Sequence, residues 1–173
     1  MTNVQIYVGT YAKYNNGSIY GKWFKLKDYS DYLELQKAIK EYHKDEEDPE
    51  FMIQDYECSE IIESLGLISE CHISKEIYEI IEEIEDCCYE EEIVEAYIHC
   101  FGGANNIQEI LDNVNESYCG EFLSDVQFTE LLLEETGDLK PELPSYIHID
   151  WERTASDIMM DYANHNNHYF RLM

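Results

Sequence analysis

The amino-acid sequence predicts an α+β protein made of three small consecutive domains. The supporting observations are an alternating apolar pattern near the start, a change to the three-to-four spacing of amphipathic helices in the middle, and a mixture of the two patterns at the end. The chain has 173 residues, of which 45% are hydrophobic, and this suffices for packed interiors. We place the domains at residues 1–58 (α+β), 59–103 (helical and acidic) and 104–173 (α+β).

The first domain is predicted to contain three strands and one helix. Its first apolar run alternates as in a half-buried strand, and Asn15-Asn16-Gly17 supplies residues suited to the turn that follows. Ser30 is a suitable N-cap for the helix, which we expect to end near His43. The predicted strands span residues 4–9, 19–26 and 51–56.

Four helices are predicted in the middle of the chain and the part that follows it, because apolar residues recur there every three or four positions. We expect Ser74 to cap the first helix, Gly102-Gly103 to end the second and Gly137 to end the fourth. The first three are expected to pack as a bundle. The predicted helices span residues 74–86, 89–101, 106–116 and 124–136.

The end of the chain is predicted to be mixed again. Residues 144–149 are expected to be extended, and Asp150 is a suitable N-cap for a helix over residues 151–163. The apolar run at residues 168–172 is expected to form an edge strand.

The charge of the chain is strongly negative and unevenly distributed. Thirty-eight Asp and Glu face eleven Lys and Arg, which gives a formal net charge of −27. Residues 1–44 hold seven Lys and four acids, a net charge of +3, whereas residues 45–173 hold four basic residues and 34 acids, a net charge of −30. Aromatic residues make up 13% of the chain, which argues against a disordered acidic tail. The negative charge is therefore predicted to lie on a folded surface.

Many of the acids follow the helical spacing and are predicted to form exposed rows that bind a partner. Like charges four residues apart on a helix repel, so a surface selected only for solubility would contain more Lys. Duplex DNA carries about one charge per 1.7 Å of its axis, and carboxylates one helical turn apart are dense enough to stand in for phosphates. The predicted partner-binding carboxylates are Glu76, Glu79, Glu82, Glu83, Glu85, Asp86, Glu90, Glu91, Glu92, Glu95, Glu109, Asp112, Glu116, Glu121, Asp125, Glu130, Glu134 and Glu135.

Other functions for an acidic surface are less consistent with the sequence. Adaptation to high salt would make the whole chain acidic, but residues 1–44 are slightly basic. An acidic module that sequesters another basic DNA-binding protein, and a hydrolase with a metal bound by carboxylates, remain as alternatives. His165 and His168 could hold a metal, but Asn166 and Asn167 between them are more typical of a turn. The chain contains no H-E-x-x-H, P-loop or G-x-S-x-G motif, so we expect no enzymatic activity, no cofactor and no metal.

The N-terminal segment and the cysteines indicate a cytoplasmic protein. The segment Met1–Gly9 has neither the basic nor the apolar region of a signal peptide, and no apolar run approaches the length of a membrane span. The six Cys include no C-x-x-C pair, and we expect them to be reduced and mostly buried.

Four segments of the sequence resemble the ArdA family of antirestriction proteins. Residues 4–24 contain K-Y-N-N-G followed by G-K-W-F, which is similar to the family's opening, and residues 53–57 read I-Q-D-Y-E. Residues 143–157 resemble the family's antirestriction motif, although Ser156 stands where a basic residue is usual and Trp151 where Tyr or Val is usual. The Tyr169-Phe170-Arg171 segment is similar to the family's last strand.

This resemblance implies an elongated, curved homodimer that imitates bent DNA. Its target would be the methyltransferase core of Type I restriction-modification complexes, met when a mobile genetic element enters a new host. The protein would block restriction, and modification as well, without binding nucleic acid or a membrane itself. The resemblance further implies that the motif contributes to the dimer contact, through Tyr146, Asp150, Trp151, Ala155 and Asp157.

Overall fold

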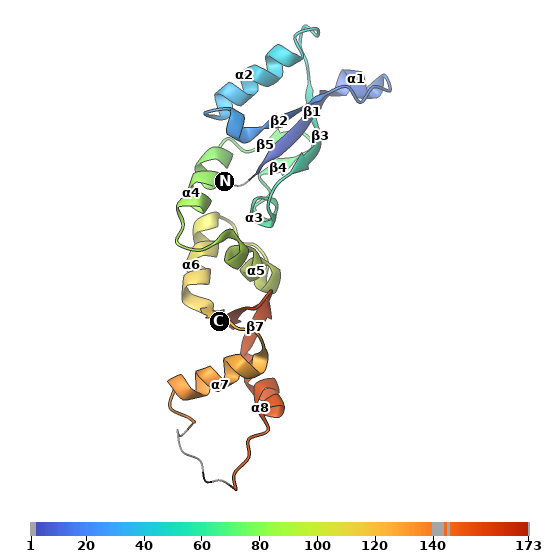
Figure 1. The fold of residues 1–173 in the computed structure, drawn as a ribbon. Helices are drawn as coiled ribbons and strands as arrows, with labels where there is room; N and C mark the ends of the chain where they lie inside the picture. The colour runs from blue at the N-terminus through green and yellow to red at the C-terminus, as the bar shows by residue number, and fades with distance from the viewer. Residues whose placement is uncertain (1–2, 140–143, 145, 173) are drawn as a thin grey trace. The chain divides into compact units, whose positions relative to one another are not determined.

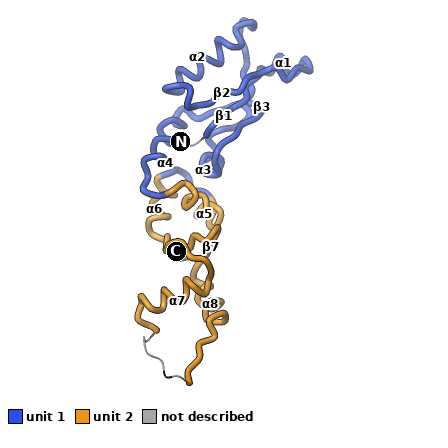
Figure 2. Tube along the Cα trace, viewed as in Figure 1, with its two compact units in different colours: residues 1–89, 103–107 blue, residues 90–102, 108–173 orange. Residues whose placement is uncertain are grey.

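The computed structural model describes residues 3–139, 144 and 146–172, and these fall into two compact units. Unit 1 comprises residues 1–89 and 103–107, and unit 2 comprises residues 90–102 and 108–173 (Figure 2). Both units combine helices with a small antiparallel sheet, which confirms the α+β class (Figure 1). The three-domain division remains a prediction.

Unit 1 is a three-stranded antiparallel sheet with a helix on one face, followed by a short hairpin and a further helix. The strand order is β2-β1-β3, so the first strand is central. The elements are β1 (Gln5–Thr10), α1 (Tyr11–Asn15), β2 (Lys22–Lys25), the 3-10 turn η1 (Leu26–Asp28), α2 (Tyr32–Tyr42), β3 (Phe51–Glu57), α3 (Glu60–Ser64), β4 (Ile68–Ser69), β5 (His72–Ile73) and α4 (Ile77–Asp86).

The alternation of β1 determines the core of unit 1. Ile6 and Val8 are buried on the face towards α2, where Leu35 and Ile39 are buried as well. Burial of such aliphatic side chains stabilises the fold by about 2 kcal/mol each, so this layer outweighs any single surface contact of the unit.

Several local predictions for unit 1 were wrong in detail. The segment before Gly17 forms helix α1, because the hydroxyl of Thr10 accepts a hydrogen bond from the backbone N–H of Lys13 and caps a helical turn. Asp31, and not Ser30, is the N-cap of α2; Ser30 instead donates its backbone N–H and its hydroxyl to Glu34. The region predicted to be all helix after residue 59 also contains the β4-β5 hairpin.

Helix α4 begins later than Ser74, the predicted cap. The Ser74 hydroxyl accepts a hydrogen bond from the backbone N–H of Glu76, and the helix starts at Ile77. Helices α4 and α5 lie in different units, and the helical bundle of the middle region stays a prediction.

Unit 2 combines four helices with a three-stranded antiparallel sheet of order β6-β8-β7 among its described residues. Its core contains the rings of Tyr97 from α5 and Phe170 from β8, whose centroids lie 5.7 Å apart. A second cluster joins Phe128 of α7 to Tyr169 of β8 at 4.8 Å. The elements are α5 (Glu91–Phe101), α6 (Ile107–Ser117), β6 (Tyr118–Glu121), α7 (Asp125–Glu135), α8 (Trp151–Ile158), the 3-10 turn η2 (Met159–Asp161), β7 (Tyr162–His165) and β8 (His168–Arg171).

Two predictions for the end of the chain are corrected by this sheet. The segment 168–171 is the central strand and not an edge strand, because β6 and β7 pair with its two sides. The helix that begins after Asp150 ends at Ile158, since residues 162–165 pair with β8. Asn166 and Asn167 adopt φ values of 49° and 69° and form the two-residue turn of this hairpin.

Candidate partner-binding surface

The acids of α4 lie on the side of the helix opposite its buried side chains. Ile77 and Ile84 are buried. The hydroxyl of Tyr78 donates a hydrogen bond of 3.2 Å to the Leu26 carbonyl oxygen, which joins the helix to η1 within unit 1. At 100° per residue the opposite side carries four exposed acids, so these carboxylates project into solvent as a row. They are Glu79, Glu82, Glu83 and Asp86.

Helix α5 carries its acids at its N-terminal end. Glu91 and Glu92 occupy the first turn, after Glu90 at the N-cap, while Val94 and Tyr97 further along the helix are buried. The helix dipole favours a negative charge at this end by about 0.5 kcal/mol, so these acids also stabilise α5.

Helix α6 repeats the arrangement of α4. Its Ile110 and Val114 are buried, and the acids Glu109, Asp112 and Glu116 are exposed at spacings of three and four residues. The sequence predicted this row correctly as an exposed surface because its apolar and acidic residues follow the same period on opposite sides.

Asp125 differs from the other predicted partner-binding acids because it has structural contacts. Its carboxylate accepts hydrogen bonds from the Tyr169 hydroxyl at 2.7 Å and from the Asn164 side chain at 3.0 Å. Burial, with this hydrogen bond as a further cause, raises the pKa of Tyr169. Asp125 therefore helps to join α7 to the sheet, a role without a local sequence signal because its partners are 39 and 44 residues away.

Most of the eighteen predicted carboxylates are accessible to a partner. Fifteen are exposed, and the three that are half-buried are Glu91, Glu95 and Glu130. Residues 76–95 contain ten acids and no Lys or Arg, so neighbouring basic residues in the sequence do not neutralise them. Lys27 of η1 lines a small cleft together with Glu82 and Glu85 of α4, within unit 1.

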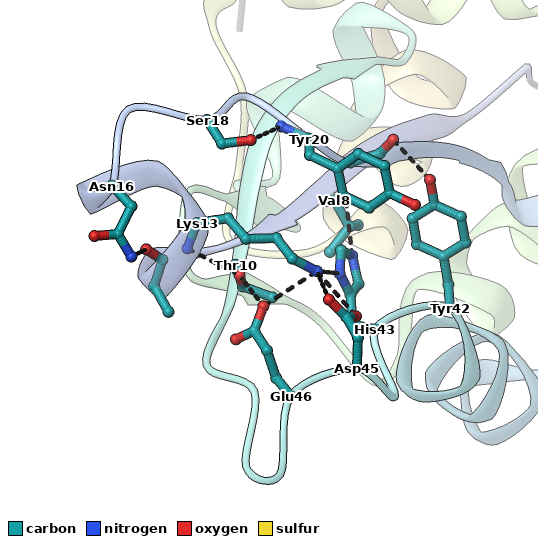
Figure 3. A network of polar contacts seen from close by, with 12 residues as sticks. Val8, Thr10, Lys13, Asn16, Ser18, Tyr20, Tyr42, His43, Asp45 and Glu46 are labelled. Carbon is teal, nitrogen blue, oxygen red and sulfur yellow. Dashed lines mark hydrogen bonds and ion pairs between the residues drawn. The ribbon is translucent and has the colours of Figure 1, made fainter.

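A second group of acids in unit 1 surrounds a lysine (Figure 3). The Lys13 Nζ atom lies 3.0 Å from Asp45 and 3.2 Å from both Glu46 and His43 Nδ1. The Thr10 hydroxyl donates a further hydrogen bond of 2.7 Å to Glu46. Sequence reasoning missed this group because its members come from α1 and from the segment after α2.

The protonation of this group follows from its contacts. Burial lowers the pKa of His43, whose Nε2 lies 3.2 Å from the Val8 carbonyl oxygen. The hydrogen bond from Lys13 lowers the pKa of Asp45, and the hydrogen bond from Thr10, followed by that from Lys13, lowers the pKa of Glu46. Burial alone would lower the pKa of Lys13, but its hydrogen bonds to the two carboxylates raise it.

Ligand atoms of His43, Asp45 and Glu46 lie within 4.8 Å of one another, a spacing that a metal ion could bridge. The ammonium group of Lys13 already contacts all three side chains and supplies the positive charge that such a cluster requires. The arrangement therefore acts as a structural ion-pair network.

A comparison with protein families settles the membership of this chain. A family model described as antirestriction protein (ArdA) matches residues 6–171, which is nearly the whole length. The chain belongs to the ArdA family. No curated protein matches it. Membership of the ArdA family implies an antirestriction function and an interaction with restriction-modification enzymes.

The motif block of this ArdA protein lies around α8. Asp150 caps the helix by accepting a hydrogen bond from the Arg153 backbone N–H, Ala155 is buried, and Trp151 is half-buried. Tyr146 and Asp157 are exposed. Leu143 and Ser145 of the block lie outside the described residues.

An open depression of about 390 Å³ adjoins this block in unit 2. Its lining combines four apolar residues with three polar ones: Val126, Ala155, Met159, Met160, Asp125, Glu152 and Ser156. Met160 is 75% exposed.

The two histidines that the sequence offered as a possible metal pair contact different partners. His165 stacks on His99 with ring centroids 3.6 Å apart, whereas His168 Nδ1 lies 3.0 Å from the Tyr118 hydroxyl, so the two histidines make different contacts.

All six cysteines are free, but the prediction that most are buried was wrong: three are exposed and three are half-buried. Among the described residues, no helix has the length and apolar character needed to cross a membrane.

Proposed function

We propose that the protein is a DNA mimic that occupies the DNA-binding groove of a Type I restriction-modification enzyme and catalyses no reaction itself. The supporting observation is the concentration of exposed carboxylates on helix faces between Glu76 and Glu135, with no Lys or Arg in that interval. A groove that neutralises phosphates attracts a surface of this kind through the same long-range field.

The magnitude of the charge is suited to this role. At one charge per 1.7 Å of duplex axis, 27 negative charges correspond to roughly 46 Å of DNA. Unit 1 has a net charge of −12 from 20 acids and 8 Lys, and unit 2 has −15 from 18 acids and 3 basic residues. Both units would therefore take part in the imitation.

We further propose that the protein acts as a homodimer whose contact includes the motif block. The depression beside Ala155 supports this, because its apolar lining residues, which include the exposed Met160, meet at one surface next to the motif block, and contiguous exposed apolar patches mark interaction sites. Trp151→Ala is expected to dissociate the dimer and to halve the length of DNA imitated. Light scattering on the variant would measure its mass.

Displacement of DNA tests the proposed mimicry. The protein is expected to release a labelled duplex from a purified Type I methyltransferase core, with an affinity that falls steeply as the salt concentration rises. Unchanged DNA binding at saturating protein and low salt would contradict the mimicry. Capture of a different basic DNA-binding protein, without any effect on the restriction enzyme, would support the alternative role as a general acidic module.

A further inference from the structure

The outer face of α2 carries a row of lysines in an otherwise acidic protein. Lys37 and Lys40 fall within about 60° of each other at the 100° helical period, with Leu33 on the same side, and Lys44 follows in the turn after the helix ends at Tyr42. All four residues are exposed, and Leu33 is 62% exposed. The row lies opposite Leu35 and Ile39, which pack into the core.

The position of these lysines is unfavourable for mimicry alone. Three positive charges weaken the attraction of a DNA-like protein to a basic groove, and exposed helix positions accept Glu or Gln at a stability difference of only about 0.5 kcal/mol. The helix dipole favours a cation near the C-terminal end of α2 but gives little support to Lys37 in the middle. Lys44 already forms an ion pair with Glu41 within the chain. A contact with negative charge outside the chain would account for Lys37 and Lys40 and would add to the pair that Lys44 makes.

An apolar cavity opens at the flank of the same helix. Its volume is about 120 Å³, and its wall is formed by Ile6, Val8, Ile39, Phe51, Ile53 and Ile73. Lys40 belongs both to this lining and to the lysine row, and Cys71 and Gln36 line the cavity as well. A partner held by the lysines could therefore place an apolar side chain in the cavity, as anchor residues do at protein interfaces.

We propose that this face, comprising Leu33, Lys37, Lys40, Lys44 and the adjacent cavity, docks an acidic segment of the restriction-modification enzyme that carries an apolar side chain. The inference rests on the proposed function, because it adds a second contact with the same enzyme. DNA is negatively charged and would not bind an acidic segment, so this contact would be additional to the imitation of DNA. It would let the protein bind this enzyme in preference to other proteins with basic DNA-binding grooves.

Charge favours an acidic protein segment over other anionic partners. Unit 1 as a whole carries −12, and Glu34 and Glu41 flank the row on α2, so a nucleic acid would meet repulsion around a small basic area. A second copy of the chain is already proposed to bind at the motif block in unit 2, whereas α2 belongs to unit 1. A short acidic segment on a protein would meet less of the surrounding negative charge than a nucleic acid would.

Reversing the charge of the three lysines distinguishes our proposal from mimicry alone, because the two predict different changes in inhibition. The variant Lys37→Glu/Lys40→Glu/Lys44→Glu makes the protein more acidic, so mimicry alone predicts inhibition of DNA cleavage that is equal or stronger. Our proposal predicts inhibition weakened by about tenfold to a hundredfold, since three favourable pairs become repulsive. The matched control Lys25→Glu/Lys27→Glu/Lys75→Glu makes the same change in charge at exposed positions away from the row and is expected not to weaken inhibition.

A milder variant and a direct binding assay complete the test. Lys37→Gln/Lys40→Gln/Lys44→Gln should retain the fold, checked by its melting temperature, and should weaken inhibition by a few-fold. Inhibition at the wild-type level by both triple variants would overturn the proposal while leaving the mimicry intact. Binding of a labelled free duplex that depends on these lysines would assign the face to nucleic acid and would overturn it as well. If the wild-type protein fails to inhibit, the proposed function and this inference both fail.

The cavity is tested separately at its lining. Cys71 is exposed, so Cys71→Phe should place a ring over the cavity without unfolding unit 1. The expected result is weaker inhibition for Cys71→Phe and unchanged inhibition for Cys71→Ser, which removes the thiol without filling the space. Equal inhibition by both variants would show that no partner side chain enters the cavity.

Discussion

Two groups of acids in unit 1 differ in how much positive charge the fold provides for them. Asp45 and Glu46 share the ammonium group of Lys13, and their pKa values are lowered by the hydrogen bonds they accept. The row on α4 stands instead in a stretch of ten acids without Lys or Arg between residues 76 and 95. The first group stabilises the unit, whereas the second repels itself and is therefore better explained by a partner.

The largest effect that we expect is the loss of stability when Lys13 is removed from its contacts with Asp45 and Glu46. Lys13→Ala would leave the Glu46 carboxylate and His43 Nδ1 without their shared donor in a site where Lys13 is only 17% exposed. We expect a loss of about 2–3 kcal/mol in the free energy of unfolding, measured by urea denaturation. Lys75→Ala, an exposed control, should change it by less than about 0.5 kcal/mol. Equal stability of the two variants would mean that the network is not structural.

A change in salt concentration should reveal the repulsion among the exposed acids of α4 and α6. Raising NaCl from about 0.02 M to 0.5 M shortens the Debye length several-fold and screens repulsion between exposed carboxylates. We expect a melting temperature higher by about 3 °C, which corresponds to roughly 1 kcal/mol for a chain of this size. A melting temperature that stays flat or falls would indicate that the acids of α4 and α6 are already neutralised.

The stability contributed by the Lys13 network should depend on pH, with a smaller effect than the loss of Lys13 itself and in a defined direction. Burial lowers the folded-state pKa of His43, so its contribution to stability is complete above the unfolded pKa, about 6.5, and is lost as pH falls through the folded pKa. Asp45 and Glu46 act in the same direction at lower pH, because their pKa values are also lowered. Between pH 7.5 and 5.5 we expect a loss of at most about 1 kcal/mol from His43.

Substitution identifies the histidine responsible. His43→Gln should remove most of this dependence between pH 7.5 and 5.5, whereas His148→Gln, at an exposed position, should retain it. Thermal melts at the two pH values would measure the difference. Identical pH dependence in both variants would contradict the assignment to His43.

The same contrast explains what the sequence could predict. Exposed rows such as Glu109, Asp112 and Glu116 were predictable because burial and exposure alternate with the helical period within one segment. The contacts of Lys13 and Asp125 were not, because their partners are 30 to 44 residues away and no local pattern identifies them.

Strand position in the sheet is also a long-range property. The apolar segment at residues 168–171 was predicted as a strand, but its central place depends on pairing with β6, about 50 residues earlier in the chain. Helix α1 is too short for a periodic signal, and only the Thr10 cap could have indicated it. Local chemistry thus predicted most helices and the acidic surfaces, and tertiary pairing determined the rest.

A mutant series on α4 tests the central claim most directly. We expect Glu79→Gln alone to weaken inhibition of DNA cleavage by at most about 1 kcal/mol, because exposed charge pairs rarely contribute more. Combining it with Glu82→Gln, Glu83→Gln and Asp86→Asn should weaken inhibition progressively, since small separate terms add. The exposed acids Asp28, Glu47, Asp48 and Glu50, neutralised together in unit 1, provide the matched control and should have a smaller effect. A single carboxylate whose loss abolishes inhibition in a folded protein would contradict a distributed mimic and indicate a catalytic or small docking site.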